Sequence, residues 1–300
     1  MKKRLLILIG VLFSFSALAG GKVHVEGNSV YLSDFQTQEL EKMFEELAYD
    51  KYIDLPDEEY PRIFVKNIPS DFATQENATE RNRTFMKILI PIVLKINEEI
   101  SEEREMVDAL LYDFEQHKDF NRMDMEYIDK LAQKYDVTTH FKDTRKYIKL
   151  LNELRKKVDI VPASLLVAGA AIYTNWGTSR IVLKANNLFK TKVWFEQEGL
   201  EPLEDKEDGY KYKIYPSLEA CVRDYMLKLN SNINYALFRE TRAVSRARED
   251  ILYGKRMDWG MVLDSNLPNF GGLLDYTLTY YKLYHIDRAH LEGERLFEEQ

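Results

Sequence analysis

The side chains best suited to binding a sugar lie in two stretches of the second half of the chain. Trp176 follows a run of small residues at 168–171. Tyr210, Tyr212 and Tyr215 lie close together on one predicted strand. Aromatic rings offer a large apolar face, and Tyr and Trp add a polar tip. The abundance of tyrosine, 19 in all, indicates a carbohydrate or interface surface without deciding between them. Trp176 is expected either to contribute to such a surface or only to fix a helix end to the core.

Carboxylates, which cleave glycosidic bonds, are missing from the first of these stretches. Residues 160–195 contain no Asp or Glu. Hydrolysis needs a carboxylic acid that protonates the leaving oxygen and a second group that attacks or stabilises the sugar. Asp159 precedes the end of the predicted helix at 162–174 by about fourteen residues, roughly 20 Å on a continuous helix. Glu196 and Glu198, in a predicted hairpin, are weak candidates for the second group only.

Other chemistries find little support. The five histidines show no metal-ligand spacing, so no metal is predicted, and we expect no cofactor. The single cysteine, Cys221, excludes an internal disulfide or a Cys-pair metal site and is expected to be inert core. With 50 acidic against 42 basic residues the formal net charge is −8, which argues against nucleic-acid binding.

The chain begins with a targeting pattern. Lys2, Lys3 and Arg4 precede an apolar run that ends near Phe15, and small residues follow at 17–20. This order is typical of a secretory signal peptide. We expect export to the periplasm or secretion, with no membrane span after cleavage, because the apolar run at 88–94 is short and contains proline.

Hydrophobic periodicity predicts the elements that would position these residues. In the first half we expect short strands at 23–25 and 30–32 and a helix through Leu40 and Leu47. A long helix or helix pair should follow at 84–116, with further helices at 126–135 and 141–158.

The second half has clearer boundaries. A helix at 162–174 should end at 175–177, with Gly177 as a left-handed cap. We then expect a structured loop at 186–189, a hairpin over 192–215, and a helix from Ser217 with Cys221 facing inward. A stripe of aromatic residues near the end of the chain is expected to be packing: Tyr276, Tyr280, Tyr281 and Tyr284.

Two blocks of residues carry a family resemblance. The first is Pro162-x-Ser164-Leu165, Ala168-x-Ala170-Ala171, Trp176-Gly177-Thr178-Ser179-Arg180 and Asn186-Asn187-Leu188-Phe189. The second is Tyr215-Pro216-Ser217-Leu218-Glu219-Ala220 with Asp224-Tyr225, Leu229 and Asn234-Tyr235. Together they resemble the peptidoglycan glucosaminidases of glycoside hydrolase family 73 (mannosyl-glycoprotein endo-beta-N-acetylglucosaminidase-like), most of all the Bax-type periplasmic proteins. The resemblance extends over residues 84–240 and includes Phe85, Leu89-Ile90-Pro91, Asn97, Ile100 and Glu103-Arg104 in the first half.

The resemblance implies a mainly α (α+β), lysozyme-like fold with a small β-hairpin lobe and a glycan cleft, preceded by an N-terminal helical segment. It implies peptidoglycan glycan strands as partner, bound by a set of side chains in the cleft: Trp176, Asn187, Phe189, Tyr212 and Tyr215. The expected divisions are a signal peptide at 1–19, a mixed region at 20–83, a helical Bax-type segment at 84–154, a glucosaminidase-like domain at 155–290 and an acidic tail at 291–300.

One departure from the family pattern concerns the chemistry itself. Where the family has its general-acid Glu, at the end of the helix before Trp176, this chain has Tyr173. A phenol, with a pKa ordinarily about 10, is a poor proton donor to a glycosidic oxygen. Three hypotheses stay open: a catalytically impaired, glycan-binding protein; an active N-acetylglucosaminidase that uses another acid; and a protein-interaction module that regulates other cell-wall enzymes.

Overall fold

The computed structural model describes residues 20–47, 49, 59–142, 144–194, 196–203, 209–248, 251–257 and 267–293. The predicted signal peptide, the centre of the hairpin turn and most of the predicted acidic tail lie outside these residues. None of the helices in the described ranges is long and apolar enough to cross a membrane.

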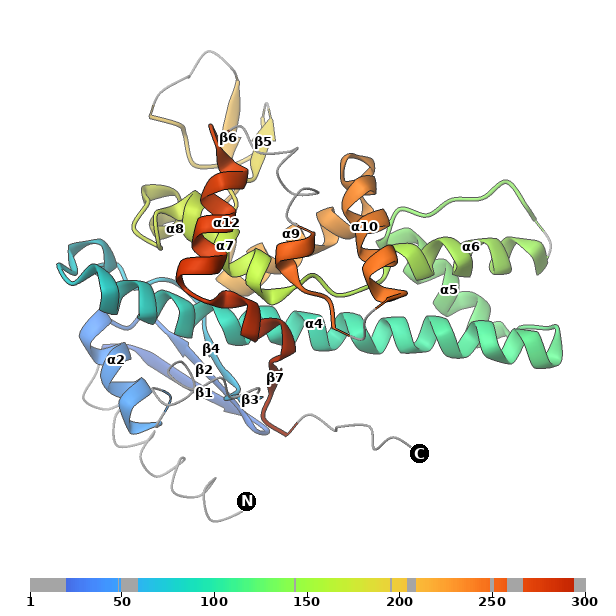
Figure 1. The fold of residues 1–300 in the computed structure, drawn as a ribbon, viewed down its shortest axis with the longest axis horizontal. Coiled ribbons are helices and arrows are strands. Elements are labelled where there is room, and N and C mark those ends of the chain that lie inside the picture. Colours follow the sequence, from blue (N-terminus) through green and yellow to red (C-terminus); the bar gives the residue numbers. More distant parts are fainter. Residues whose placement is uncertain are drawn as a thin grey trace.

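Helix α4 (Ala78–His117) is the longest described element and runs along the molecule (Figure 1). Its 40 residues correspond to about 60 Å of helix. Asn77 caps its start by accepting hydrogen bonds from two backbone N–H groups, and Lys118 ends it in a left-handed conformation. The sequence predicted either one long helix or a helix pair at 84–116, and the structure has one continuous helix.

Proline inside α4 is accommodated by a tertiary hydrogen bond. Pro91 has no N–H and leaves the Lys87 carbonyl without its helical donor. The hydroxyl of Tyr49 donates to that carbonyl at 3.0 Å. Residues 88–94 around Pro91 are buried, so this apolar run is core, as the sequence predicted.

A small sheet covers the N-terminal half of α4. Strands β1 (Lys22–Glu26) and β2 (Ser29–Ser33) form an antiparallel hairpin, and β4 (Ile63–Val65) pairs parallel to β2. Helix α2 (Thr37–Glu46) follows β2. The two predicted strands and the helix after them are confirmed. A second pair, β3 (Glu59–Tyr60) with β7 (His290–Leu291), brings the C-terminal end of the described chain back to this region.

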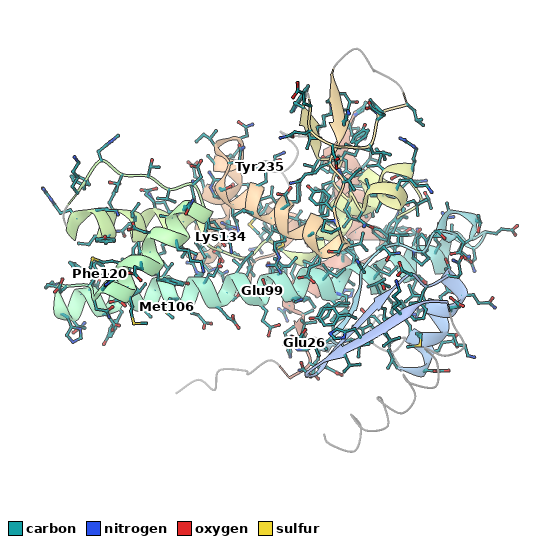
Figure 2. All side chains as sticks on the ribbon, turned by 180° about the vertical axis from the view of Figure 1, so that it is seen from behind. Glu26, Glu99, Met106, Phe120, Lys134 and Tyr235 are labelled. Atoms are coloured by element: carbon teal, nitrogen blue, oxygen red, sulfur yellow. The ribbon has the colours of Figure 1, made fainter. Side chains whose placement is uncertain are left out.

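The C-terminal half of α4 forms an arm with α5 (Arg122–Lys134) and α6 (Thr144–Lys157). Figure 2 shows Phe120 at the far end of this arm, where its ring stacks on Phe114 at 4.8 Å. Helix α5 starts earlier than the predicted 126 because Asn121 and Asp124 form a capping box.

The second half of the chain is helical with one small hairpin. Its elements are α7 (Ala163–Thr174), α8 (Arg180–Ala185), β5 (Lys192–Trp194), β6 (Tyr210–Tyr212), α9 (Leu218–Ser231), α10 (Ala236–Arg246) and α12 (Phe270–Tyr280). Short 3₁₀ turns lie among them: η3 (Ile233–Tyr235), η4 (Gly254–Arg256) and η5 (Leu283–Arg288). A further turn, η1 (Phe72–Thr74), precedes α4 in the first half. The predicted mainly α class with a small hairpin lobe is confirmed.

Helix α4 also packs against α7 and α9, so the two halves share one hydrophobic core. Charges reinforce this contact: Arg223 on α9 binds Glu99 on α4, which Figure 2 labels, and Lys95 on α4 binds Glu219 at 3.0 Å. The expected domain boundary near residue 155, between the helical segment and the glucosaminidase-like domain, stays a prediction.

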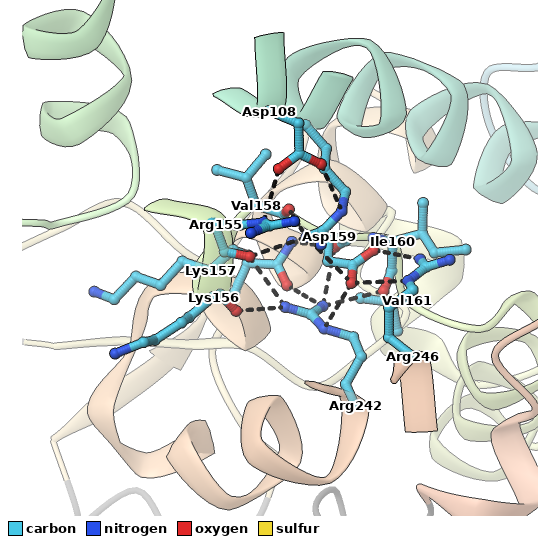
Figure 3. A network of polar contacts seen from close by, with 12 residues as sticks. Asp108, Arg155, Lys156, Lys157, Val158, Asp159, Ile160, Val161, Arg242 and Arg246 are labelled. Carbon is cyan, nitrogen blue, oxygen red and sulfur yellow. Dashed lines mark hydrogen bonds and ion pairs between the residues drawn. The ribbon is translucent and has the colours of Figure 1, made fainter. Parts of the chain in front are cut away.

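A buried ionic network joins α4, α6 and α10 (Figure 3). Asp159 is 3% exposed and lies 2.5 Å from Arg246 and 3.4 Å from Arg104. Arg242, 1% exposed, donates to the carbonyls of Lys157, Asp159 and Ile160, and so caps the C-terminal end of α6. Burial lowers the pKa of Arg242 to about 10, so it stays charged at neutral pH.

Candidate glycan-binding site

Helix α7 carries the candidate site at its C-terminal end and is buried over residues 163–171. Its twelve residues contain no charged side chain, and small residues at 168–171 allow neighbouring helices to approach closely. Helices α4 and α12 occupy these faces. The end of α7 is therefore held from two sides, as positioning a ligand requires.

The start of α7 is fixed by a carboxylate from far along the chain. Asp287 accepts hydrogen bonds from the Ser164 N–H and hydroxyl at 2.9 and 2.8 Å, and from the Gly254 N–H at 2.9 Å. Desolvation by burial raises the pKa of Asp287 to about 6, although these three donors act in the opposite direction. A buried acid thus replaces the local side-chain cap that Pro162 cannot provide.

This carboxyl predicts a pH dependence of stability. Because the pKa of Asp287 is higher in the folded protein than its ordinary 3.8, the folded state binds more protons between about pH 4 and pH 6. The free energy of unfolding should fall over that window as pH rises, by up to about 3 kcal/mol. Asp287→Asn removes this contribution. Urea unfolding at pH 4 and pH 7 measures the free energy of unfolding of both proteins. Between pH 4 and pH 7 the wild type should lose stability relative to the variant. A difference between the two proteins that is the same at both pH values would contradict the assignment to Asp287.

The C-terminal end of α7 is an unusually tight turn. Asn175, Trp176 and Gly177 all have positive φ, at 48°, 57° and 80°. The sequence assigned the left-handed cap to Gly177, but Asn175 is the cap, because asparagine also tolerates this conformation. The side chain of Thr174 accepts a hydrogen bond from the Gly177 N–H at 2.9 Å and stabilises the turn. A Cβ atom on Gly177 would lie 2.8 Å from the Phe85 ring, so the backbone passes directly over α4.

This turn brings Trp176 into an aromatic cluster. The Trp176 ring centroid lies 4.3 Å from that of Tyr281 and 6.0 Å from that of Phe85. The Asn82 amide donates to the Tyr281 hydroxyl at 2.8 Å. Trp176 is half-buried, so its ring both fixes the helix end and leaves surface for a ligand. The two sequence interpretations of this residue are compatible.

The ring of Tyr173 packs against an aromatic side chain from α12. It stacks on Phe270 at 5.1 Å and 30°, and Phe270 is 2% exposed at the start of α12. In the family resemblance this position is that of the general-acid Glu, and an apolar neighbour of this kind raises the pKa of a carboxyl group and so suits a general acid. Here the residue beside Phe270 is a phenol. The sequence did not indicate Phe270, because nothing local shows that a residue about a hundred positions later packs on α7.

Three of the predicted glycan-binding residues are inside the protein, which corrects that expectation. Asn187 is fully buried, and its amide binds the carbonyls of Thr191 and Lys213 at 2.9 Å. Phe189 stacks on Tyr225 at 4.0 Å. Tyr215 is 4% exposed and donates to Asp224 at 2.6 Å, and burial raises the pKa of this phenol. The polar groups of Asn187 and Tyr215 are thus used within the fold, and the Phe189 ring packs on α9.

The hairpin offers its own aromatic surface. Tyr212 is half-buried and pairs edge to face with Tyr210 at 5.5 Å. Trp194 on β5, which the sequence analysis did not single out, is half exposed and lies 5.9 Å from Tyr210. Glu196 and Glu198 are exposed in the segment that follows β5. Of the predicted site residues, Trp176 and Tyr212 thus keep accessible ring surface.

Two further expectations concern residues outside the site. Asp159 is bound in the network of Figure 3, so its carboxylate serves the fold. Cys221 is buried on α9, and burial raises the pKa of its thiol to about 12, which agrees with inert core. No group of His, Cys, Asp and Glu side chains in the described part of the chain could hold a metal ion.

Comparison with known proteins shows what this part of the chain is similar to. Residues 148–261 match the glucosaminidase family, described as mannosyl-glycoprotein endo-beta-N-acetylglucosaminidase. This stretch contains α7 with its aromatic end and the hairpin, and so resembles a glucosaminidase domain. The chain is also similar to Protein bax of Escherichia coli (strain K12), with 28% identity over 191 residues. The match covers 63% of this chain and 65% of Protein bax. The predicted family resemblance is confirmed.

A solved structure, the catalytic domain of the autolysin Auto from Listeria monocytogenes, also resembles the chain. It is 15% identical and covers 56% of this chain and 89% of that domain, with a TM-score of 0.32. A TM-score this low carries no further argument about the site.

Proposed function

We propose that this protein is exported to the periplasm or the cell surface, binds peptidoglycan glycan strands at the end of α7, and does not hydrolyse them. The observation that carries this proposal is Tyr173. In a glucosaminidase-type domain it occupies the acid's position and packs on Phe270. Protonation of the leaving oxygen is essential to glycoside hydrolysis, and a phenol performs it poorly.

Glycan binding is supported by the aromatic surface that remains. Trp176 and Tyr212 are half-buried, and Trp194 adds a half-exposed ring on the hairpin. Neutral sugar rings bury apolar C–H faces against such side chains, and their hydroxyls find polar partners at the ring tips. Binding by stacking does not require the missing acid.

Export is supported by the pattern of the first nineteen residues, in which basic, apolar and small residues follow in the order of a signal peptide. A glucosaminidase-type domain directed at peptidoglycan has its ligand outside the cytoplasm, which is consistent with this expectation.

The alternative of an active hydrolase depends on Glu196 or Glu198. Both are exposed in the segment that follows β5, so among the described residues neither is enclosed by apolar side chains of the kind that surround a glycosidase's general acid. The silent, glycan-binding function is favoured for this reason.

A pair of measurements tests the proposal. Purified protein should sediment with insoluble peptidoglycan and leave a peptidoglycan zymogram without clearing. Clearing that disappears in Tyr173→Phe would overturn the silent function, and clearing lost in Glu196→Gln or Glu198→Gln would identify the acid. Folded protein that stays in the supernatant would exclude both glycan functions and leave the protein-interaction module.

A further inference from the structure

Four large apolar side chains form an exposed stripe along α12 and the turn after it. They are Leu273, Tyr276, Tyr280 and Tyr284, with 42%, 59%, 64% and 49% of their surfaces exposed. Leu273, Tyr276 and Tyr280 are spaced by three and four residues and so share one face of α12. They extend over roughly 10 Å at the rise of an α-helix. Tyr284 lies beyond the end of α12, in η5, after Lys282 in a left-handed conformation. The expectation that the tyrosines near the end of the chain are packing is wrong for three of them, and holds only for Tyr281.

The rings of the stripe are ordered relative to one another. Tyr276 and Tyr280 are stacked at 5.4 Å with an interplanar angle of 19°. Two nearly parallel tyrosine rings four residues apart pack against each other and form one ordered aromatic unit. Exposed contiguous apolar surface of this kind marks a binding site more often than an isolated exposed residue does.

The stripe is continuous with the candidate glycan-binding site. Tyr280 contacts Tyr281 at 5.0 Å, and Tyr281 contacts Trp176 at 4.3 Å. A chain of ring contacts thus leads from the solvent face of α12 to the end of α7.

The charge of α12 distinguishes among possible ligands. Its eleven residues include one charged side chain, Asp275, whereas 31% of the whole chain is charged. Asp275 is itself paired with Lys255 at 3.3 Å. Anionic nucleic acid or lipid would need a basic surface. A neutral ligand with apolar faces and many hydroxyl groups matches this face, on which Thr279 and the tyrosine tips are the polar groups.

We propose that the stripe formed by Tyr276 and Tyr280, with Leu273 and Tyr284 at its ends, is a second stacking platform for a chain of N-acetylhexosamine rings. It extends the site at Trp176 along α12. The inference rests on the proposed function, since the glycan that lies on the stripe is the strand bound at Trp176. The platform lengthens the bound segment and so selects polymeric over short glycans.

The experiment compares a double variant with a matched control. Tyr276→Ala/Tyr280→Ala removes both ring faces at positions where the side chains are exposed, so the fold should be kept. Tyr112→Ala removes an equally exposed tyrosine, 63% exposed, on the far arm of α4. Binding is measured by calorimetry with N-acetylglucosamine oligomers of increasing length and by sedimentation with insoluble peptidoglycan.

The double variant should bind the longest oligomers roughly tenfold more weakly than wild type, while short oligomers bind both proteins equally. Tyr112→Ala should match wild type, and Tyr276→Phe/Tyr280→Phe should restore binding because the faces are retained. If the alanine variant binds long oligomers as tightly as wild type does, the platform is overturned and the proposed function is left intact. If the wild type binds no glycan, the platform and the proposed function are both overturned. If the wild type is a dimer that the alanine substitutions convert to a monomer, the platform is also overturned, because the stripe would then be a self-association surface.

Discussion

Tyr173→Glu is expected to convert the silent protein into a peptidoglycan hydrolase. The new carboxyl would face Phe270 beside Trp176, and apolar surroundings raise the pKa of a carboxyl group. It would therefore stay protonated to a higher pH than an exposed glutamate and could protonate the leaving oxygen. General acid catalysis contributes about 10²–10⁴-fold, so release of reducing ends from peptidoglycan should rise from background by at least about a hundredfold.

Tyr173→Gln is the matched control, because glutamine has the size of glutamate and no acidic proton. It should stay inactive and sediment with peptidoglycan as wild type does. The Tyr173→Glu rate should fall as pH rises through the raised pKa of the new acid. A Tyr173→Glu protein that is folded, binds glycan and releases nothing would show that the site has lost more than its acid.

Asp159→Ala is expected to cost about 3–5 kcal/mol of stability, the range typical of breaking a buried ion pair. The change would leave Arg242 and Arg246 without their carboxylate partner, and Arg242 is almost fully buried. Urea unfolding at pH 7 followed by circular dichroism measures the loss. At temperatures where the variant is folded, its binding to peptidoglycan should be unchanged, because Asp159 serves the fold and not the site.

Two comparisons make this result specific. Glu126→Ala breaks the exposed pair with Arg122 and should cost less than about 1 kcal/mol. Asp159→Asn keeps the shape of the side chain and its bond to the Ile160 N–H, and should fall between wild type and alanine. An Asp159→Ala protein as stable as Glu126→Ala would mean that the carbonyl groups around Arg242 satisfy its charge without a carboxylate.

The elements of this fold could be predicted from the sequence wherever periodicity and caps are local. Strands at 23–25 and 30–32 and the helix from Ser217 follow from apolar spacing and from turn or cap residues, and the structure has them. The continuity of α4 could not be predicted, because Pro91 is compatible with one helix only through the hydroxyl of Tyr49, which the sequence places far away.

The motif alone predicts that Tyr173 stands at the position of the family's acid, and that assignment stays a prediction. The surface of the candidate site could not be predicted. Whether Asn187 and Tyr215 face a ligand or the interior depends on partners such as Lys213 and Asp224, which the hairpin brings together only in three dimensions. The stripe on α12 was misjudged for the converse reason, since a row of aromatic residues looks the same in sequence whether a partner covers it or not.

The long helix α4 limits how far the glucosaminidase-type domain can be treated as a transferable module. The family match starts at residue 148, after α4 has ended, yet α4 covers faces of α7 and α9 that hold the site in place. Moved to another chain without α4, this stretch would expose apolar surface and lose the support beneath Trp176. The part of this chain that must fold together therefore includes the preceding helix.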